Sequence, residues 1–464
     1  MTLLEINSGD TAWILISAAL VLLMTPGLAF FYGGMVRAKS VLNMMMMSFI
    51  SMGVIGVLWV LFGYSMAFGN SVGGAGIIGN PFEYAGLQGL LTYDPEASYP
   101  ALAFVAFQAC FAIITVALVS GAVADRASFG AWTLFTVLWG TLVYFPAAHW
   151  VFAFSNEDAG VVGGWIANQI GALDFAGGTA IHINAGTAAL VLALVVGPRV
   201  GFGTKPMRPH NMTLVMLGAA LLWFGWFGFN AGSAVAANGL ASLAWVNTLA
   251  ATAAAMLGWL IVERFRDGHA TSLGAASGIV AGLVAITPAA GSVDPLGAMA
   301  IGVLAGVACA FAVGLKYRFG YDDSLDVVGV HLIGGLVGTL LIGLFASPLA
   351  ATTNANSDDP AVAADPGVAG LFYGGGLDQL GKQAIGAFGL MAYSAIVTLL
   401  IALIIKYTIG WRIKTSDELS GIDNVEHSES GYDLSPVYYS NKVNRTLFLT
   451  KDDLPETETT GADK

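Results

Sequence analysis

Two histidines lie inside long apolar stretches of this sequence, where ionisable side chains are rarely placed. His182 stands between two isoleucines, and His331 stands between a valine and a leucine. Burying an ionisable group costs free energy, so such residues usually face a pathway or a binding site. Desolvation favours the neutral imidazole, which offers one N–H donor and one acceptor nitrogen. The pair therefore suits a small polar solute or a proton relay, and two satisfied structural histidines are the alternative.

The surroundings of these histidines do not suggest a metal site or an enzyme. No cysteine and no paired carboxylate accompanies them at metal-ligand spacing. No nucleophile–base pair occurs within the apolar stretches. Cys110 and Cys309 lie far apart in apolar runs and are interpreted as small buried hydrophobes. The sequence predicts no catalytic residue, no metal and no cofactor.

An acidic residue and several aromatic residues stand near the ends of the same stretches. Asp174 precedes His182 by eight residues, about 12 Å along a helix, so we expect it to cap that helix rather than touch the imidazole. A purely structural cap and a cap that shapes a cation site both remain open. Phe107 and Phe111 share one helix face, and Phe229 and Ser233 form another four-residue pair. Such aromatics usually serve packing, but π faces and a hydroxyl on one side of the molecule could hold a small cation.

The composition indicates what kind of element positions these residues. Of the 464 residues, 56% are hydrophobic and only 10% are charged, with a mean hydropathy of +0.74. About a quarter of the residues are charged in soluble domains. The net charge of -12 argues against nucleic-acid binding, which needs a basic face. We expect an all-α polytopic protein that lies in a lipid bilayer.

Hydropathy and helix-breaking residues divide the chain into eleven apolar segments. Each approaches or exceeds the roughly 17 residues that a membrane helix needs. The segments cover residues 12–33, 41–68, 101–123, 130–153, 177–197, 211–230, 240–262, 272–290, 296–315, 327–346 and 385–409.

Charged residues orient these segments. Ten basic residues fall in odd-numbered connections, whereas the even connections hold Lys382 and many acidic residues. The ten basic residues are Arg37, Lys39, Arg126, Arg199, Lys205, Arg208, Arg264, Arg266, Lys316 and Arg318. Because positive charge is retained in the cytoplasm, the N-terminus is expected outside and the C-terminus inside the cell membrane.

An odd number of helices permits an internal symmetry. Five helices carry the chain across the membrane, so a second set of five is inverted relative to the first, with one helix added at the end. Asp174 with His182, and Asp326 with His331, open the fifth and tenth segments from opposite sides, as inversion requires. Residues 1–409 are therefore expected to form one membrane domain. The polar residues 410–464 are expected to form a cytoplasmic tail, disordered in its last part.

Several motifs then resemble the ammonium transporter (Amt/Mep/Rh) family, of the bacterial or archaeal Amt type. The resemblance spans about residues 12–434 and carries its motifs in the family's order. The motifs are Gly33-Gly34 with Arg37, Phe107-Gln-Ala-Cys-Phe111, Asp174-Phe-Ala-Gly-Gly-Thr-Ala-Ile-His182-Ile-Asn-Ala-Gly186, Trp226-Phe-Gly-Phe-Asn-Ala-Gly-Ser233, Thr287-Pro288 and Asp322-Asp-Ser-Leu-Asp326-Val-Val-Gly-Val-His331.

This resemblance implies eleven helices, an outside N-terminus, a homotrimer with one pore per subunit, and ammonium uptake. The ion would be recognised outside and deprotonated, after which ammonia and a proton cross a histidine-lined pore. The implied roles are substrate recruitment by Phe107, Ser233 and Asp174, gating by Phe111 and Phe229, and pore lining by His182 and His331. A passive ammonia channel of the Rh type, or an ammonium sensor that signals through its tail, are the alternatives.

The sequence departs from the family pattern at the recruitment site. A tryptophan usually closes the run after the fourth segment, whereas Phe152 occupies that place here. Either Phe152 supplies a weaker cation–π contact, or Trp150 or Trp165 takes the place. In the tail, residues 410–432 are similar to the segment that couples subunits and receives a PII-type regulatory protein. Residues 435–464 extend beyond the resemblance and receive no role.

Overall fold

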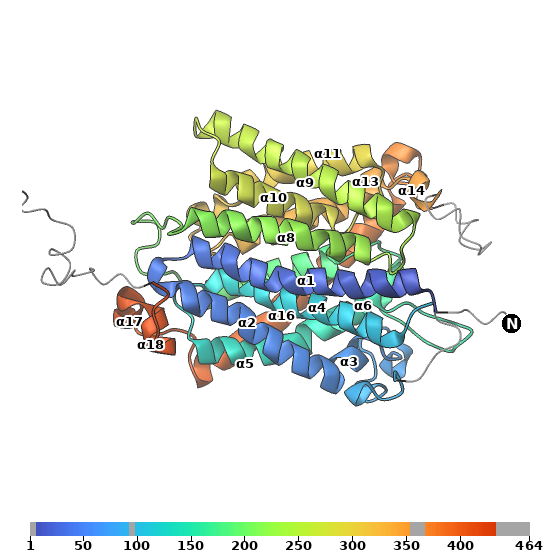
Figure 1. Ribbon diagram of the computed structural model, residues 1–464, viewed down its shortest axis with the longest axis horizontal. Coiled ribbons are helices and arrows are strands. Elements are labelled where there is room, and N and C mark those ends of the chain that lie inside the picture. The colour runs from blue at the N-terminus through green and yellow to red at the C-terminus, as the bar shows by residue number, and fades with distance from the viewer. Residues whose placement is uncertain (1–5, 92–97, 353–366, 433–464) are drawn as a thin grey trace, which may run out of the picture.

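A computed structural model describes residues 6–91, 98–352 and 367–432, which fold into a bundle of helices that run along one long axis (Figure 1). Within this described part, ten helical segments are long and apolar enough to cross a membrane, and α10 is a shorter apolar helix. The helices are α1 (Ser8–Met35), α2 (Val41–Leu58), α3 (Tyr64–Phe68), α4 (Ala101–Val119), α5 (Phe129–Trp139), α6 (Phe145–Phe152), α7 (Asn184–Val196), α8 (Met212–Gly232), α9 (Gly239–Arg266), α10 (Ser272–Ile286), α11 (Pro295–Ala312), α12 (Leu315–Phe319), α13 (Ile333–Phe345), α14 (Pro348–Thr352), α16 (Asp378–Thr408), α17 (Thr415–Ser420) and α18 (Ile422–His427).

The eleven predicted segments correspond to these helices, and most boundaries agree within four residues. Helix α16 begins at Asp378, seven residues before the predicted segment, because two polar side chains of its first turns, Gln379 and Gln383, are buried and hydrogen-bonded. The Gln383 side chain accepts a hydrogen bond from the Leu173 N–H at 2.6 Å and donates to the Leu173 carbonyl at 2.7 Å. Helix α10 ends at Ile286 rather than at residue 290, where Thr287 and Pro288 follow. A proline cannot continue the backbone hydrogen-bonding pattern.

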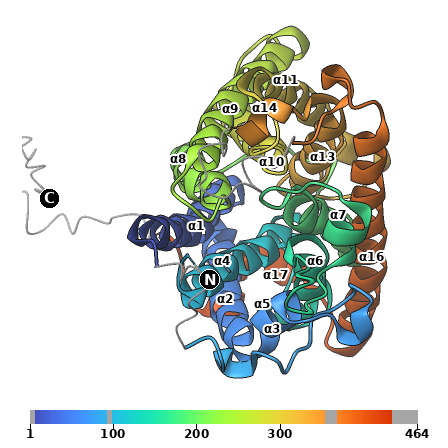
Figure 2. The same ribbon diagram turned by 90° about the vertical axis from the view of Figure 1, so that its right-hand side faces the viewer.

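Two sets of helices face one another across the centre of the bundle (Figure 2). The first set runs from α1 to α7 and the second from α8 to α13, while α16 lies along one flank against α5, α7 and α13. Close approach of the two sets depends on Gly186 in α7. A Cβ atom there would lie 2.4 Å from the backbone nitrogen of Leu332, the residue after His331.

The two ends of the bundle differ in what they carry. Helix α1 begins at one end, and α17 and α18 lie at the other, which we call the tail end (Figure 1). At the tail end, the buried Asp423 carboxylate accepts hydrogen bonds from the Leu42 and Asn43 N–H groups, so the tail caps the start of α2. The buried Glu418 carboxylate pairs with Arg412 at 2.7 Å. Residues 433–464, including the segment predicted to be disordered, lie outside the described residues.

Candidate functional site

The two histidines singled out from the sequence meet in the middle of the bundle. The Nδ1 atoms of His182 and His331 lie 3.2 Å apart, and the imidazole centroids are 5.3 Å apart at an interplanar angle of 28°. Both side chains are buried, with exposures of 1% and 3%. A hydrogen bond between two Nδ1 atoms needs one donor and one acceptor, so at least one ring is neutral. The Nε2 atom of His182 is buried without a protein partner and is free to contact a solute.

Each histidine sits on a widened helical turn that an aspartate caps. His182 lies in the π turn Gly178–Ile183, and His331 lies in the π turn Val328–Leu332. Such π turns are rare and recur at functional sites. The Asp174 carboxylate accepts four backbone N–H bonds, from Gly177, Gly178, Thr179 and Ala180 at 2.7–3.2 Å, which confirms the predicted cap. Asp323 accepts two, from Val327 and Val328.

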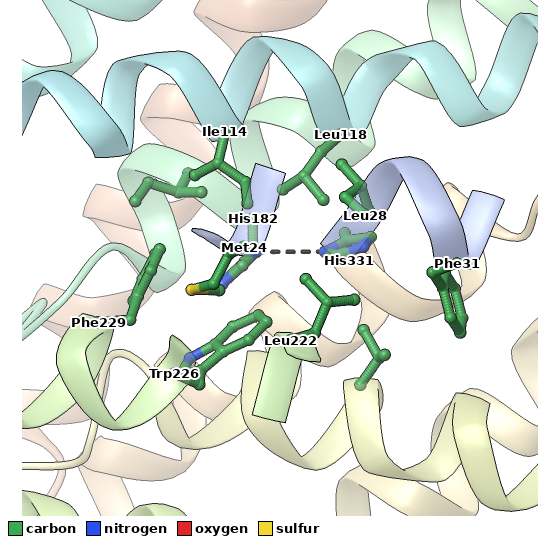
Figure 3. A pocket seen from close by; sticks show the side chains of 12 residues that line it. Met24, Leu28, Phe31, Ile114, Leu118, His182, Leu222, Trp226, Phe229 and His331 are labelled. Carbon is green, nitrogen blue, oxygen red and sulfur yellow. Dashed lines mark hydrogen bonds between the residues drawn. The ribbon is translucent and has the colours of Figure 1, made fainter. Parts of the chain in front are cut away.

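The histidines border a small apolar cavity of about 10 Å³ (Figure 3). Phe229 closes it on one side of the pair and Phe31 on the other (Figure 3). This volume matches a single water-sized molecule. The remaining lining side chains are hydrophobic or aromatic: Met24, Leu28, Ile114, Leu118, Ile181, Leu222, Trp226 and Val280. A neutral solute with few hydrogen-bonding groups fits this cavity better than a hydrated ion, which would lose its water shell here.

Trp226 fixes the orientation of His182. Their ring centroids lie 5.4 Å apart at 20°, so the indole stacks on the imidazole. The indole N–H in turn donates to the Thr287 hydroxyl at 2.8 Å, and that hydroxyl donates to the Leu283 carbonyl. The sequence gave Trp226 as part of a motif, and its contact with the histidine required the fold.

Two phenyl rings in close, tilted contact separate the cavity from a larger space. The centroids of Phe111 and Phe229 lie 4.4 Å apart at 41°, and Phe107 packs edge-on against Phe111 at 4.7 Å. All three rings are 1% exposed. A solute must displace these rings to move from the larger space to the histidines.

The larger space, which we call the vestibule, has a volume of about 420 Å³. It brings together four residues from separate parts of the sequence: Phe107, Phe152, Asp174 and Ser233. The Ser233 hydroxyl donates to the Phe229 carbonyl at 2.8 Å, which leaves its oxygen lone pairs available as acceptors. Burial raises the pKa of the Asp174 carboxyl, and its four N–H bonds oppose that shift. The end of the bundle that carries this space is the vestibule end.

The sequence left open whether Phe152, Trp150 or Trp165 completes the recruitment site. Neither residue lines the vestibule, whereas Phe152 does. The Trp150 indole points away and donates to the Ile77 carbonyl at 2.6 Å, and its ring packs on Tyr393 and Trp165. Because its N–H and its ring are engaged in these contacts, Trp150 serves packing in this structure.

A second small cavity continues the path beyond Phe31 toward the tail end. It measures about 10 Å³ and is lined by Phe31, Tyr32, Ser277, Asp326 and His331, among others. Sequence reasoning assigned no role to Phe31 or Tyr32, whose positions at the end of an apolar segment gave no signal. The acidic run before His331 was the one hint that a polar mouth lies here. Across the described residues, no group of three potential metal ligands forms.

Comparisons with known proteins agree with this arrangement. The model of the Ammonium Transporter Family matches residues 12–432. An ammonium transporter of Mycobacterium tuberculosis is 62% identical over 446 residues, which cover 92% of this chain and 91% of that protein. The crystal structure of Saccharomyces cerevisiae Mep2 superimposes with a TM-score of 0.79 at 32% identity, covering 94% of this chain and 93% of that one. A structure named Sensor Amt Protein gives a TM-score of 0.78 at 27% identity, covering 90% and 98%.

Proposed function

This chain belongs to the ammonium transporter family and transports ammonium, and we propose that it does so by moving ammonia and a proton separately through the pore described above. The chain is a membrane transporter and not an enzyme. One observation carries the proposed route: a hydrogen-bonded His182–His331 pair inside a cavity too small and too apolar for a hydrated cation.

Recognition of the cation is proposed for the vestibule. Phe107 and Phe152 offer π faces, and the Ser233 hydroxyl offers an oxygen acceptor. Asp174 lines this space as a half-buried side chain whose oxygens are bound to four amides, so we assign it an indirect role. It orients the turn and contributes negative potential rather than acting as a direct ligand.

Deprotonation is proposed where the ion meets the Phe111–Phe229 gate. An ammonium ion that enters the apolar cavity loses its hydration, which favours release of a proton and passage of neutral ammonia. The unpartnered His182 Nε2 can accept a hydrogen bond from ammonia or a proton. The Nδ1–Nδ1 contact then supplies a path for that proton from one imidazole to the other.

We propose that the vestibule end faces outside and that the tail end is cytoplasmic. Basic residues that sequence analysis placed in odd connections form ion pairs at the tail end, namely Arg37 and Arg199 with Asp125, and Arg199 with Asp322 at 2.8 Å. Positive charge in short loops marks the cytoplasmic side. The multi-pass membrane location itself follows from family membership and from the ten long apolar helices in the described part of the chain.

Assembly and regulation are proposed from the resemblance together with the surface. A homotrimer would cover the exposed apolar side chains of α9 and α11, such as Leu257, Ile261, Val303 and Phe311. Residues 410–432 dock on the cytoplasmic loops through Glu418 and Asp423, so a PII-type protein bound at this face would be coupled to the start of α2. Cross-linking and native mass spectrometry of the full chain test both assemblies.

The decisive experiment is an ammonium pulse on proteoliposomes, with current and lumenal pH recorded together. Separate passage of ammonia and a proton predicts a current with little alkalinisation of the lumen. Alkalinisation without current would favour the passive ammonia channel. A slow transport rate with a normal response of the tail to ammonium would favour a sensor, and one similar structure is named a sensor.

A further inference from the structure

The tail end of the pore carries a lysine whose position the transport route does not explain. Lys316 lies at the end of the α11–α12 segment and is only 7% exposed. Its ammonium group lies 2.7 Å from Oδ1 of Asp326 and donates to the Asp323 carbonyl at 2.9 Å. Buried lysines are rare unless they are paired. The question is what this paired cation does beside the pore.

Asp326 connects Lys316 to the pore. Its side chain is 25% exposed and lines the second small cavity, the one beyond Phe31, together with Tyr32 and His331. Lys316 does not line that cavity and lies behind Asp326. Asp326 adopts φ +63°, an unusual conformation for a residue with a side chain, two residues before the turn that carries His331. A transported species that passes His331 therefore meets a carboxylate already bound to a cation.

The carboxylates at the two mouths have different counter-charges. Asp174 at the vestibule end accepts hydrogen bonds from four backbone N–H groups and takes part in no ion pair among the described residues. Asp323 at the tail end accepts two N–H bonds, and Lys316 lies beside it. The carboxylate at the vestibule end therefore still attracts a cation, whereas the carboxylates at the tail end already have a cation, Lys316, beside them.

We propose that Lys316 is a built-in ammonium group that occupies the acidic site at the inner mouth and so allows ammonium formed there to leave. The proposal rests on the proposed function, in which ammonia and a proton recombine on the tail side. The side chain of lysine ends in an alkylammonium group, the same chemical class as the substrate. Without it, Asp326 would face the pore as an uncompensated carboxylate and would hold the product.

Three variants separate this role from a structural one. K316M leaves Asp326 unpaired, D326N leaves Lys316 unpaired, and the K316M/D326N double variant removes both charges. The conservative variant K316R keeps the cation and serves as the control. Each protein is reconstituted as the full chain, and its initial transport rate is measured against ammonium concentration from the current and the lumenal pH.

The expected pattern has a sign for each variant. In K316M the product is retained, so both the maximal rate and the KM fall, each by about three- to tenfold. In D326N the unpaired lysine repels the emerging cation, so the maximal rate falls while the KM does not. The double variant recovers most of the maximal rate, and K316R stays close to the unmodified protein.

The results test the role of Lys316 and the proposed transport route separately. A K316M protein with unchanged rate and KM would overturn the role of Lys316, as would a double variant no faster than K316M. If K316M fails to assemble, D326N still decides, because a lowered KM there contradicts the proposal. Absence of any ammonium-dependent signal in the unmodified protein would instead overturn the proposed transport route.

Discussion

The half of the pore at the vestibule end and the half at the tail end use the same local structure with different electrostatics. In both halves an aspartate caps a π turn, and that turn presents a histidine to the centre of the bundle. Asp174 relies on four amide N–H groups, whereas Asp323 has two and a lysine beside it. The shared structure places the imidazoles, and the two mouths of the pore differ in the counter-charge beside their aspartates.

The same contrast extends to the two ends of the whole molecule. At the tail end Arg199 is 6% exposed and forms ion pairs with both Asp125 and Asp322. Burial alone would raise the pKa of both carboxyls, but the charge and hydrogen bonds of neighbouring groups, above all Arg199, outweigh it and lower both pKa values. Among the residues that the structure describes, Lys382 with Asp378 is the ion pair of the vestibule end. The charged side chains at the tail end are therefore mostly paired, whereas the vestibule end has few ion pairs among the described residues.

The largest expected effect tests the part that the halves share. H182A/H331A removes the hydrogen-bonded pair and should abolish charge movement, a loss of at least about a hundredfold in current. The reason is that no other titratable side chain lines the central cavity. Currents are recorded on an ammonium pulse in proteoliposomes, with W226F, which keeps both imidazoles, as the matched control. Unchanged currents in the double variant would exclude the proton role of the pair.

The second prediction tests the difference between the two caps. D174A strands four amide N–H groups and D323A strands two, at about 1–3 kcal/mol for each buried group that finds no water. D174A should therefore lower the melting temperature more than D323A and lose most transport while still assembling. Thermal unfolding in detergent and size-exclusion chromatography measure this. Equal losses in both variants, or full transport in D174A, would contradict the role assigned to the outer cap.

The sequence predicted the shared part of this comparison better than the difference. Hydropathy and the distribution of charged residues predicted the segments. Single polar residues inside or beside apolar stretches predicted His182, His331 and the cap at Asp174. Hydropathy treated Lys316 as one more basic loop residue, because burial at a helix end depends on Asp326, which lies ten residues away in a strained backbone conformation. The π turns were also missed, because no periodicity distinguishes them from an ordinary helix.

A third, smaller effect concerns the positioning of His182 alone. W226F keeps an aromatic face but removes the indole N–H that binds the Thr287 hydroxyl. Loss of one buried hydrogen bond costs about 0.5–1.5 kcal/mol, so the maximal rate should fall by roughly two- to tenfold with little change in KM. T287V provides the matched control, since it removes the same bond from the other side. A change in KM alone would place Trp226 in recognition rather than in positioning.

The smallest expected effect tests whether the vestibule recognises a cation through its aromatic faces. Phe152 lines that space where the family pattern has a tryptophan, and tryptophan gives the strongest cation–π contact. F152W should lower the KM for ammonium by about two- to fivefold, as a gain of 0.5–1 kcal/mol implies, with an unchanged maximal rate. F152L, which keeps the apolar volume but has no π face, should raise the KM. If both variants keep the original KM, attraction at the outer mouth comes from the charge and dipoles around Asp174 and not from this ring.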